Sequence, residues 1–401
     1  MKKQKPLEGV RVLEIASMIF GPLAGQYLGD MGAEVIKLEP PEGDLTRSIG
    51  PRRSALMGAF FMSSNRNKRS IVVDLKRPEG QEILQKLMAT TDVLLHSLRT
   101  PAANKLGLDY KTLAAKNPAL VYCHVSGYAD EGLYGGRPAY DDIIQAASGL
   151  AKMQTIIAGQ PRYIPTIIAD KISGLHAAWG IALALLHKFR TGEGQQVDVP
   201  MFETMTAFNM FEHQWGHVFQ PPLAGMGYQP VSTASRRPYR TKDGFIALLP
   251  YSDFHWRQFF KLAGEPQIMD DPRFSTFAAR QKHFRDVWDE IERQAARKTS
   301  AEWLELLGND DIPFSLVNDI EDLPNDPHLE SVGFWKRMEH ATEGMLLMPS
   351  PAVYMSATPA EITRLPPNLG QDGADILREC GYGDSAAQEL LKPGGVCAGH
   401  I

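Results

Sequence analysis

VRVLEIASMIFGPLAGQYLGDMGAEVIKLE, residues 10–39, decides the fold of this chain. Residues 10–16 have the apolar composition of a buried strand, and residues 34–39 predict a second strand. Between them, residues 21–32 predict a helix with small residues on one face. A strand, a helix and another strand in this order form the unit from which parallel sheets are built.

The same alternation continues through the first half of the chain. Strand patterns recur at residues 70–75, 92–98 and 119–128, with helical spacing at residues 78–88 and a helical piece before the last strand. A long helix rich in small residues follows Asp170. These patterns predict an α/β protein with a mostly parallel sheet covered by helices.

A second, smaller domain is expected after a change of composition near Gln220. A strand begins at Tyr239, a turn occupies residues 242–244, and helical charged segments run from 254 to 307. We therefore expect a large domain of residues 1–219 and 330–401 and a small α+β domain of residues 226–329. A Met- and Phe-rich helix at residues 202–219 is expected to lie in the core or in a dimer interface.

Composition excludes several classes of function. The net charge of −5 is spread without a basic stripe, so we expect no nucleic-acid partner. No apolar run reaches the length of a membrane span, and the briefly basic N-terminus leads directly into a strand, unlike a signal peptide. The three cysteines, Cys123, Cys380 and Cys397, have neither metal nor disulfide spacing. We therefore expect a reduced, cytoplasmic protein without a metal site, with Cys123 in the core.

Three glycines of the opening stretch invite a dinucleotide-binding interpretation. Gly21, Gly25 and Gly29 follow a strand, and Glu39 ends the next strand, where an acidic residue would hold a ribose. Their spacing, however, is G-x3-G-x3-G rather than the G-x-G-x-x-G that brings backbone close to a pyrophosphate. Close packing of the helix on the sheet is the favoured interpretation. His124, His176 and His187 lie in apolar segments and are expected to be structural.

Asp170 is the strongest candidate for chemistry, at the end of IPTIIAD (residues 164–170) and the start of a helix. Aspartate is a preferred N-cap residue, so the plain interpretation is a structural cap. The functional interpretation uses the same geometry, because a helix N-terminus stabilises an ionised carboxylate that can attack an acyl group. Residue patterns alone leave both interpretations open.

Several segments in a fixed order resemble the class III coenzyme A transferases. They are LEGVRVLEIASMIFGPLAGQYLGDMGAEVIKLEPPEGDLTR (7–47), NRNKRSIVVDLKRPEG (65–80), LGLDYKTLAAKNPALVYCHVSGY (106–128), RPAYDDIIQAASG (137–149), the segment 169–204 and DIPFSLVNDIEDLPNDPHLESVGF (311–334). The resemblance covers nearly the whole chain. It implies a Rossmann-like large domain built from both chain ends, a small middle domain, and two subunits interlocked as a homodimer.

The resemblance also implies an activity. The family's catalytic aspartate falls on Asp170, whose carboxylate would attack a donor acyl-CoA, possibly succinyl-CoA, to give a mixed anhydride and then an aspartyl-CoA thioester. A carboxylic acid acceptor would then reverse these steps. Coenzyme A would be a substrate, and no tightly bound cofactor is expected. The implied coenzyme A contacts are Ile19, Phe20, Val73, Asp74, Leu75, Lys76, Ser97, Leu98, Arg99, Lys105, Ala139, Tyr140 and Asp141, with Lys76, Arg99 and Lys105 as phosphate partners.

Three departures from the family pattern affect this expectation. His96-Ser97-Leu98 stands where the family often has Glu-Asn before an aromatic residue, and Ile19 replaces a glutamine of formyl-CoA transferase. The glycine-rich active-site loop of that enzyme is not reproduced, and only Gly225 and Gly227 lie nearby.

Two alternatives to the transferase stay open. An α-methylacyl-CoA racemase of the same family would need a histidine where this chain has Tyr140, and a tyrosine is a poor base at neutral pH. A non-catalytic acyl-CoA-binding protein is the third hypothesis. For a dicarboxylic substrate, Arg236 and Arg237 are candidates to hold the second carboxylate.

Overall fold

The computed structural model describes residues 4–308 and 310–399. The chain divides into two compact units, one of Met1–Leu150, Tyr163–Phe208 and Ser331–Ile401, the other of Ala151–Arg162 and Asn209–Glu330. Residues 151–162 and 209–219, which the sequence analysis assigned to the large domain, fall in the second unit. The division cuts through helix α10 (Met201–His213), a continuous element with no break in sequence pattern to mark it.

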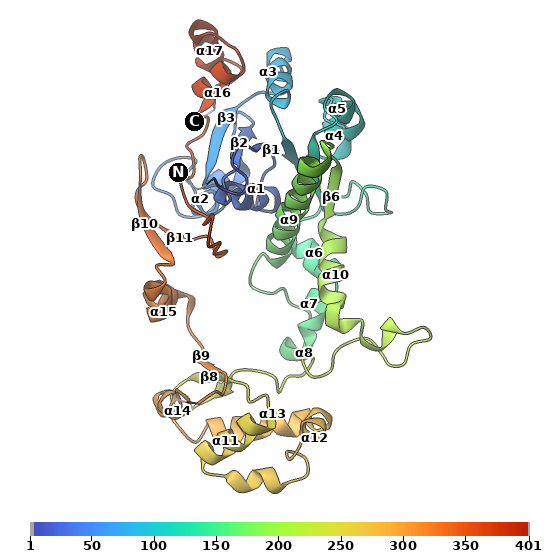
Figure 1. Cartoon of the computed structure of the whole chain (residues 1–401), viewed down its shortest axis with the longest axis vertical. Helices are drawn as coiled ribbons and strands as arrows, with labels where there is room; N and C mark the ends of the chain where they lie inside the picture. The colour runs from blue at the N-terminus through green and yellow to red at the C-terminus, as the bar shows by residue number, and fades with distance from the viewer. Residues whose placement is uncertain (1–3, 309, 400–401) are drawn as a thin grey trace. The chain divides into compact units, whose positions relative to one another are not determined.

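A six-stranded parallel sheet forms the centre of the first unit, as the sequence predicts (Figure 1). The strand order is β3-β2-β1-β4-β5-β6, that of a doubly wound dinucleotide-binding fold. The strands are β1 (Arg11–Ile15), β2 (Glu34–Glu39), β3 (Lys68–Val72), β4 (Val93–His96), β5 (Val121–Ser126) and β6 (Gln196–Pro200).

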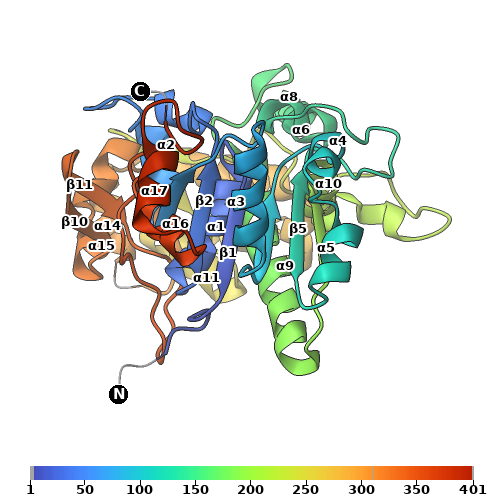
Figure 2. The same ribbon diagram turned by 90° about the horizontal axis from the view of Figure 1, so that it is seen from above.

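Helices cover both faces of this sheet. Helices α1 and α9 pack together on one face, whereas α3, α16 and α17 cover the other (Figure 2). The helices of this unit are α1 (Phe20–Asp30), α2 (Ala59–Ser64), α3 (Pro78–Met88), α4 (Thr100–Lys105), α5 (Tyr110–Lys116), α6 (Asp141–Ala147), α9 (Ile168–Thr191), α16 (Gly373–Glu379) and α17 (Asp384–Leu391). Helices α16 and α17 come from the C-terminal part of the chain.

The C-terminal segment returns to the first unit. Strands β10 (Trp335–His340) and β11 (Gly344–Pro349) form an antiparallel hairpin, and α16 then packs beside β3. Ile376 and Leu377 of α16 share a buried cluster with Ile71 of β3 and Ile83 of α3. Cys123 is fully buried in β5 as expected, and all three cysteines are free.

The glycines of α1 confirm the packing interpretation. A Cβ atom at Gly21 would lie 2.4 Å from the Cβ of Ala16, and one at Gly25 would lie 1.9 Å from Oε2 of Glu14. Both glycines therefore let α1 approach β1 more closely than any larger residue would allow. Both carboxylate oxygens of Glu39 accept hydrogen bonds of 2.7 Å from the buried Arg47. The carboxylate is therefore already bonded within the protein and does not serve to hold a ribose.

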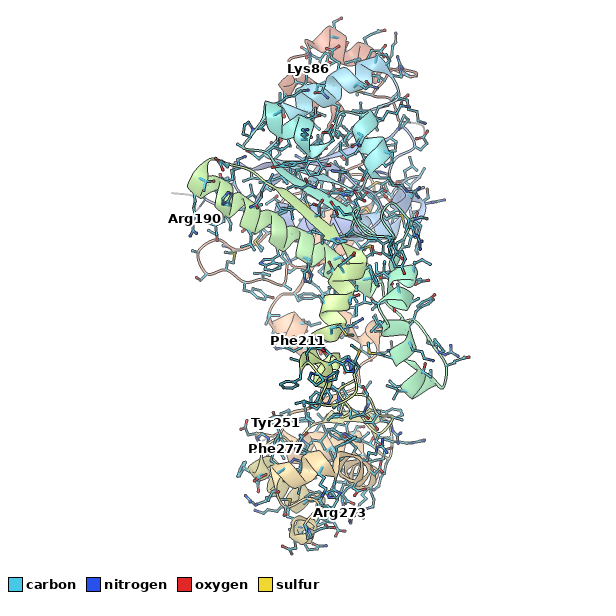
Figure 3. All side chains as sticks on the ribbon, turned by 90° about the vertical axis from the view of Figure 1, so that its right-hand side faces the viewer. Lys86, Arg190, Phe211, Tyr251, Arg273 and Phe277 are labelled. Atoms are coloured by element: carbon cyan, nitrogen blue, oxygen red, sulfur yellow. The ribbon has the colours of Figure 1, made fainter. Side chains whose placement is uncertain are left out.

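The second unit has its own core. Strands β7 (Tyr239–Arg240), β8 (Phe245–Leu248) and β9 (Phe314–Leu316) form a small antiparallel sheet. Helices α11 (Asp253–Ala263), α13 (Phe284–Ala295) and α14 (Ser300–Leu307) bury Trp256, Phe259 and Trp303 against it. This unit also contains α8 (Thr155–Ala158) and α12 (Phe277–Lys282), while α7 (Leu150–Met153) and α15 (Pro327–Ser331) lie at its boundaries. In Figure 3, Tyr251 and Phe277 mark one exposed ring pair of the unit.

The described residues contain neither a candidate membrane span nor a candidate metal site. None of their helices is long and apolar enough to cross a membrane. Nowhere in residues 4–308 and 310–399 do three His, Cys, Asp or Glu side chains gather into a group able to hold a metal ion.

Candidate active site

Sheet topology places a crevice between β1 and β4. The strand order reverses at this pair, and ligands of open α/β sheets bind outside the carboxyl ends of the strands at such a point. The segment after β1 begins at Ala16, and the segment after β4 begins at Ser97. Both segments line cavities in the structure.

Two adjoining cavities open at this edge of the sheet. The outer cavity, about 590 Å³, lies over the ends of β1, β2 and β3 and is lined by Ile15–Ser17, Lys37–Leu45, Val73–Lys76, Ser97 and Leu98. The inner cavity, about 220 Å³, includes Ser17, Met18, Phe20, Leu45, Ser97–Arg99, His124–Tyr128, Asp130, Gly136–Tyr140, Asp170 and Met201. Ser17, Leu45, Ser97 and Leu98 line both, so the two cavities meet there.

The cavities bring together most residues that the sequence singled out. Val73, Asp74, Leu75 and Lys76 line the outer cavity, and Ser97 and Leu98 line both. Phe20, Arg99, Ala139, Tyr140 and Asp170 line the inner cavity. The remaining three lie elsewhere: Ile19 is buried before α1, Lys105 is exposed in the last turn of α4, and Asp141 is buried at the start of α6.

Asp170 is not the N-cap of its helix, so the capping interpretation is wrong. Helix α9 begins at Ile168 with Ile167 in the cap position, and Asp170 lies in its first turn. Asp141 supplies the cap from α6, because its Oδ1 accepts the N–H groups of Ala169 at 2.7 Å and Asp170 at 3.2 Å. The carboxylate of Asp170 is thereby left available to the inner cavity.

Burial and charge set the acidity of Asp170. Burial, and after it the negative charge of Asp141, raises the pKa of Asp170 to about 7. We expected the helix N-terminus to favour the ionised form, but removal from water has the larger effect here. A carboxyl group with a pKa near neutrality is typical of functional sites.

Three cationic side chains lie at the cavities without a protein acid. Lys76 belongs to the outer cavity, and Arg99 and Arg137 to the inner one. Among the described residues, no carboxylate forms an ion pair with any of the three; Arg137 instead lies 4.5 Å from the ring centroid of Tyr134. Unpaired cations beside a cavity suit phosphate or carboxylate ligands.

His124 is a cavity residue that the sequence patterns did not indicate. His124 lies at the wall of the inner cavity, stacks on His96 at 4.8 Å, and its Nε2 lies 3.1 Å from the carbonyl oxygen of Leu98. Its Nδ1 lies 3.7 Å from Asp130 and 3.8 Å from Asp198. His124 is therefore bonded within the protein, as expected, while also facing the site. Its place next to the end of β5 was the available signal, since parallel strands end at the same edge.

Comparisons with known proteins show the family of the chain. The sequence pattern of CoA-transferase family III matches residues 7–373. The succinate–glutarate CoA-transferase of Agrobacterium fabrum is 33% identical over 94% of this chain and 96% of its own length. The human succinyl-CoA:glutarate CoA-transferase is 30% identical over 98% of this chain and 90% of its own.

Solved structures show the same fold. Rv3272 from Mycobacterium tuberculosis superimposes with a TM-score of 0.82 at 30% identity, covering 94% of this chain and 100% of the other. A CAIB/BAIF family protein from Brucella suis gives a TM-score of 0.79 at 29% identity, again over 94% and 100%. The chain belongs to CoA-transferase family III.

Proposed function

We propose that this enzyme transfers coenzyme A from an acyl-CoA donor to a carboxylic acid through covalent intermediates on Asp170. The observation that carries the proposal is the position of Asp170 in a small cavity that adjoins a larger one at the switch point of the sheet. A CoA thioester bound in the outer cavity has its reactive end directed through the shared residues toward Asp170.

The reaction needs only the carboxylate and the two substrates. An oxygen of Asp170 attacks the donor carbonyl carbon, the C–S bond breaks, and CoA thiolate leaves a mixed anhydride. The thiolate then attacks the Asp170 carbonyl carbon, which releases the donor acid and leaves an aspartyl-CoA thioester. An acceptor carboxylate displaces CoA from this thioester, and CoA then attacks the acceptor acyl carbon and frees Asp170. No net proton or electron is exchanged.

The two cavities suit the two ends of the substrate. The outer cavity falls within the range of about 300–1,000 Å³ that is usual for ligand pockets, and it suits the nucleotide part of coenzyme A. Lys76 and Arg99 are proposed to bind its phosphates, with Lys105 as a further candidate on α4. The inner cavity is much smaller, which favours a short acyl group.

A short dicarboxylic acyl group is the proposed substrate, with succinyl-CoA as donor. The relatives named above act on succinate and glutarate, both of which carry a second carboxylate. Arg137 belongs to the same cavity as Asp170 and has no acid partner among the described residues. A guanidinium in this position matches the free carboxylate of such a group. Arg237, one of the two arginines that the sequence offered for the second carboxylate, lies 3.6 Å from Glu292 in the second unit and so already has an acid partner.

An interlocked homodimer is the proposed assembly. One face of α9 leaves Leu175, Trp179, Leu183 and Leu186 between 45% and 62% exposed in the single chain. Their spacing of three and four residues places them along one side of the helix. Arg190 marks the end of this helix in Figure 3, where Phe211 of α10, 91% exposed, is also labelled. Such apolar surface is costly in water and fits a subunit interface.

The proposed location is the cytoplasm. The free cysteines agree with such a reducing setting.

Loss of the Asp170 carboxylate tests the proposed chemistry. The Asp170→Asn variant should lose CoA exchange between succinyl-CoA and glutarate while still binding coenzyme A. Asp142→Asn is the matched control, because Asp142 is an exposed residue of α6 outside both cavity linings. Near-wild-type exchange by the Asp170→Asn variant would refute the mechanism. Uptake of deuterium at the acyl α-carbon without CoA exchange would indicate a racemase instead.

A further inference from the structure

A cluster of buried charges adjoins the outer cavity. It consists of Glu14, Lys37, Glu39, Asp44, Arg47 and Lys68, each at most 2% exposed. Three acids are matched by three bases. Lys37, Glu39 and Asp44 also contribute to the lining of the outer cavity. None of these residues takes part in the proposed chemistry.

Lys37 connects this cluster to the segment that follows β1. Its Nζ donates to Oε1 of Glu14 at 2.9 Å and to the carbonyl oxygen of Ala16 at 2.8 Å, and it lies 2.9 Å from Oδ2 of Asp44. Burial alone would lower the pKa of Lys37, but Glu14 and Asp44 raise it above its ordinary value. Lys37 therefore stays positively charged, and its partners are Glu14, Ala16 and Asp44.

Asp44 holds the other end of the same segment. Its Oδ1 accepts the N–H of Met18 at 3.3 Å and both the N–H and hydroxyl of Thr46 at 2.9 and 2.8 Å. The three residues Ala16, Ser17 and Met18 are thus held at their first carbonyl by Lys37 and at their last N–H by Asp44.

The backbone of this segment is in an unusual conformation. Met18 has φ = 68°, in the left-handed region that side chains other than glycine rarely adopt. Such conformations persist where surrounding contacts enforce them, and they gather at functional sites. Ser17 faces both cavities and Met18 faces the inner one, so the segment forms part of the passage between them.

Lys68 provides an internal comparison. It is equally buried and donates to Oε1 of the same Glu14 at 3.0 Å, but its other partners are the carbonyl oxygen of Pro22 and Oδ1 of Asn65. Lys68 therefore shares Glu14 and full burial with Lys37, although burial lowers the pKa of Lys68 to about 8, and none of the bonds given for Lys68 reaches residues 16–18.

We propose that Lys37 and Asp44 are positioning residues that fix the Ala16–Met18 segment so that the bound thioester is directed at Asp170. This inference rests on the proposed transferase function. Displacement of reacting groups by about 1 Å can cost a factor of about a hundred in rate. Loss of either contact should therefore reduce kcat more than it weakens coenzyme A binding.

The test compares Lys37→Met with Lys68→Met in the full-length enzyme. Both variants remove one buried ammonium from Glu14, so both should lower the melting temperature. Only Lys37→Met should lower kcat for CoA exchange, by about ten- to a hundredfold, with the KM for succinyl-CoA within about threefold of wild type. Wild-type exchange is measured first, and its absence would refute the proposed function rather than this inference.

Equal loss of kcat in both variants, or unchanged kcat in Lys37→Met, would overturn the inference. If Lys37→Met does not fold, Asp44→Ala tests the same link because it removes the acceptor of the Met18 N–H. Thr46→Val is its control because Thr46 also bonds to Asp44 but not to the segment. A fall in kcat for Asp44→Ala alone supports the inference, and an equal response of these two variants overturns it.

Discussion

Asp141 caps the helix that carries Asp170, and the charge of the same carboxylate helps to raise the pKa of Asp170. Oδ1 of Asp141 accepts the N–H of Asp170 at 3.2 Å, and its charge is the second cause, after burial, of the raised pKa of Asp170. One side chain thus anchors the nucleophile's backbone and adds to the effect of burial, which together raise the pKa of Asp170 to about 7. Two consequences can be measured.

The stability of the enzyme should depend on pH through Asp170. Because the folded state binds this proton more tightly than the unfolded state, the free energy of unfolding falls as pH rises from about 4 to 7. The Asp170→Asn variant has no carboxyl group to ionise. Its melting temperature should match that of the wild type near pH 5 and exceed it at pH 8. The corresponding difference in the free energy of unfolding at pH 8 is on the order of 2–4 kcal/mol. A constant difference across this range would contradict the raised pKa.

The rate should rise with pH as Asp170 ionises. The kcat/KM for exchange should increase up to about pH 7 and then level off, because only the carboxylate is a nucleophile. Asp141→Asn keeps an oxygen for the two N–H groups but loses the charge, so the midpoint should move to lower pH. Asp142→Asn, one residue along α6, should leave the midpoint in place. An unchanged midpoint in Asp141→Asn would show that its charge has no part in the titration.

Arg137 should determine the preference for dicarboxylic substrates. In Arg137→Gln the KM for glutarate should rise by about ten- to a hundredfold, because a charge-assisted hydrogen bond to its second carboxylate is lost. The KM for a monocarboxylate such as butyrate should be unchanged. Arg236→Gln is the comparison, because Arg236 is the competing candidate in the second unit. If Arg236→Gln alone loses the preference, the second carboxylate is held there and the role of Arg137 is refuted.

The apolar face of α9 should hold two subunits together. Trp179, 62% exposed in the single chain, is the largest side chain on this face. Trp179→Lys should halve the mass measured by light scattering, or leave an unstable chain, because a charge cannot be buried there without a partner. Lys116→Glu, a larger change of surface charge on α5, should leave the mass unchanged. A monomeric wild-type enzyme would contradict the interface directly.

The sequence predicted the sheet because a sheet of this kind depends on local patterns, whereas most of the candidate cavity residues were implied by the resemblance to the class III coenzyme A transferases. Apolar strands alternating with helices specify a parallel sheet, and the ordered motifs identified Asp170 and the segments after β3 and β4. The cap was missed because Asp141 lies 29 residues before Asp170, and no local pattern links them.

Buried charges were the other omission. Glu14 and Lys37 occupy the apolar strands β1 and β2, and their pairing depends on parallel strands that bring Glu14 opposite Lys37 in register. A charged residue inside an otherwise apolar strand was the only sequence signal. The strand order that forms the crevice likewise depends on long connections rather than on any one motif.

Trapping the covalent intermediate tests the central claim most directly. The wild-type enzyme is incubated with succinyl-CoA, first without acceptor, then treated with hydroxylamine, digested and analysed by mass spectrometry. The account predicts a hydroxamate on Asp170, absent from Asp170→Asn and diminished when glutarate is added before the hydroxylamine. An enzyme that exchanges CoA at full rate without any adduct on Asp170, or with an adduct on another residue, would contradict it.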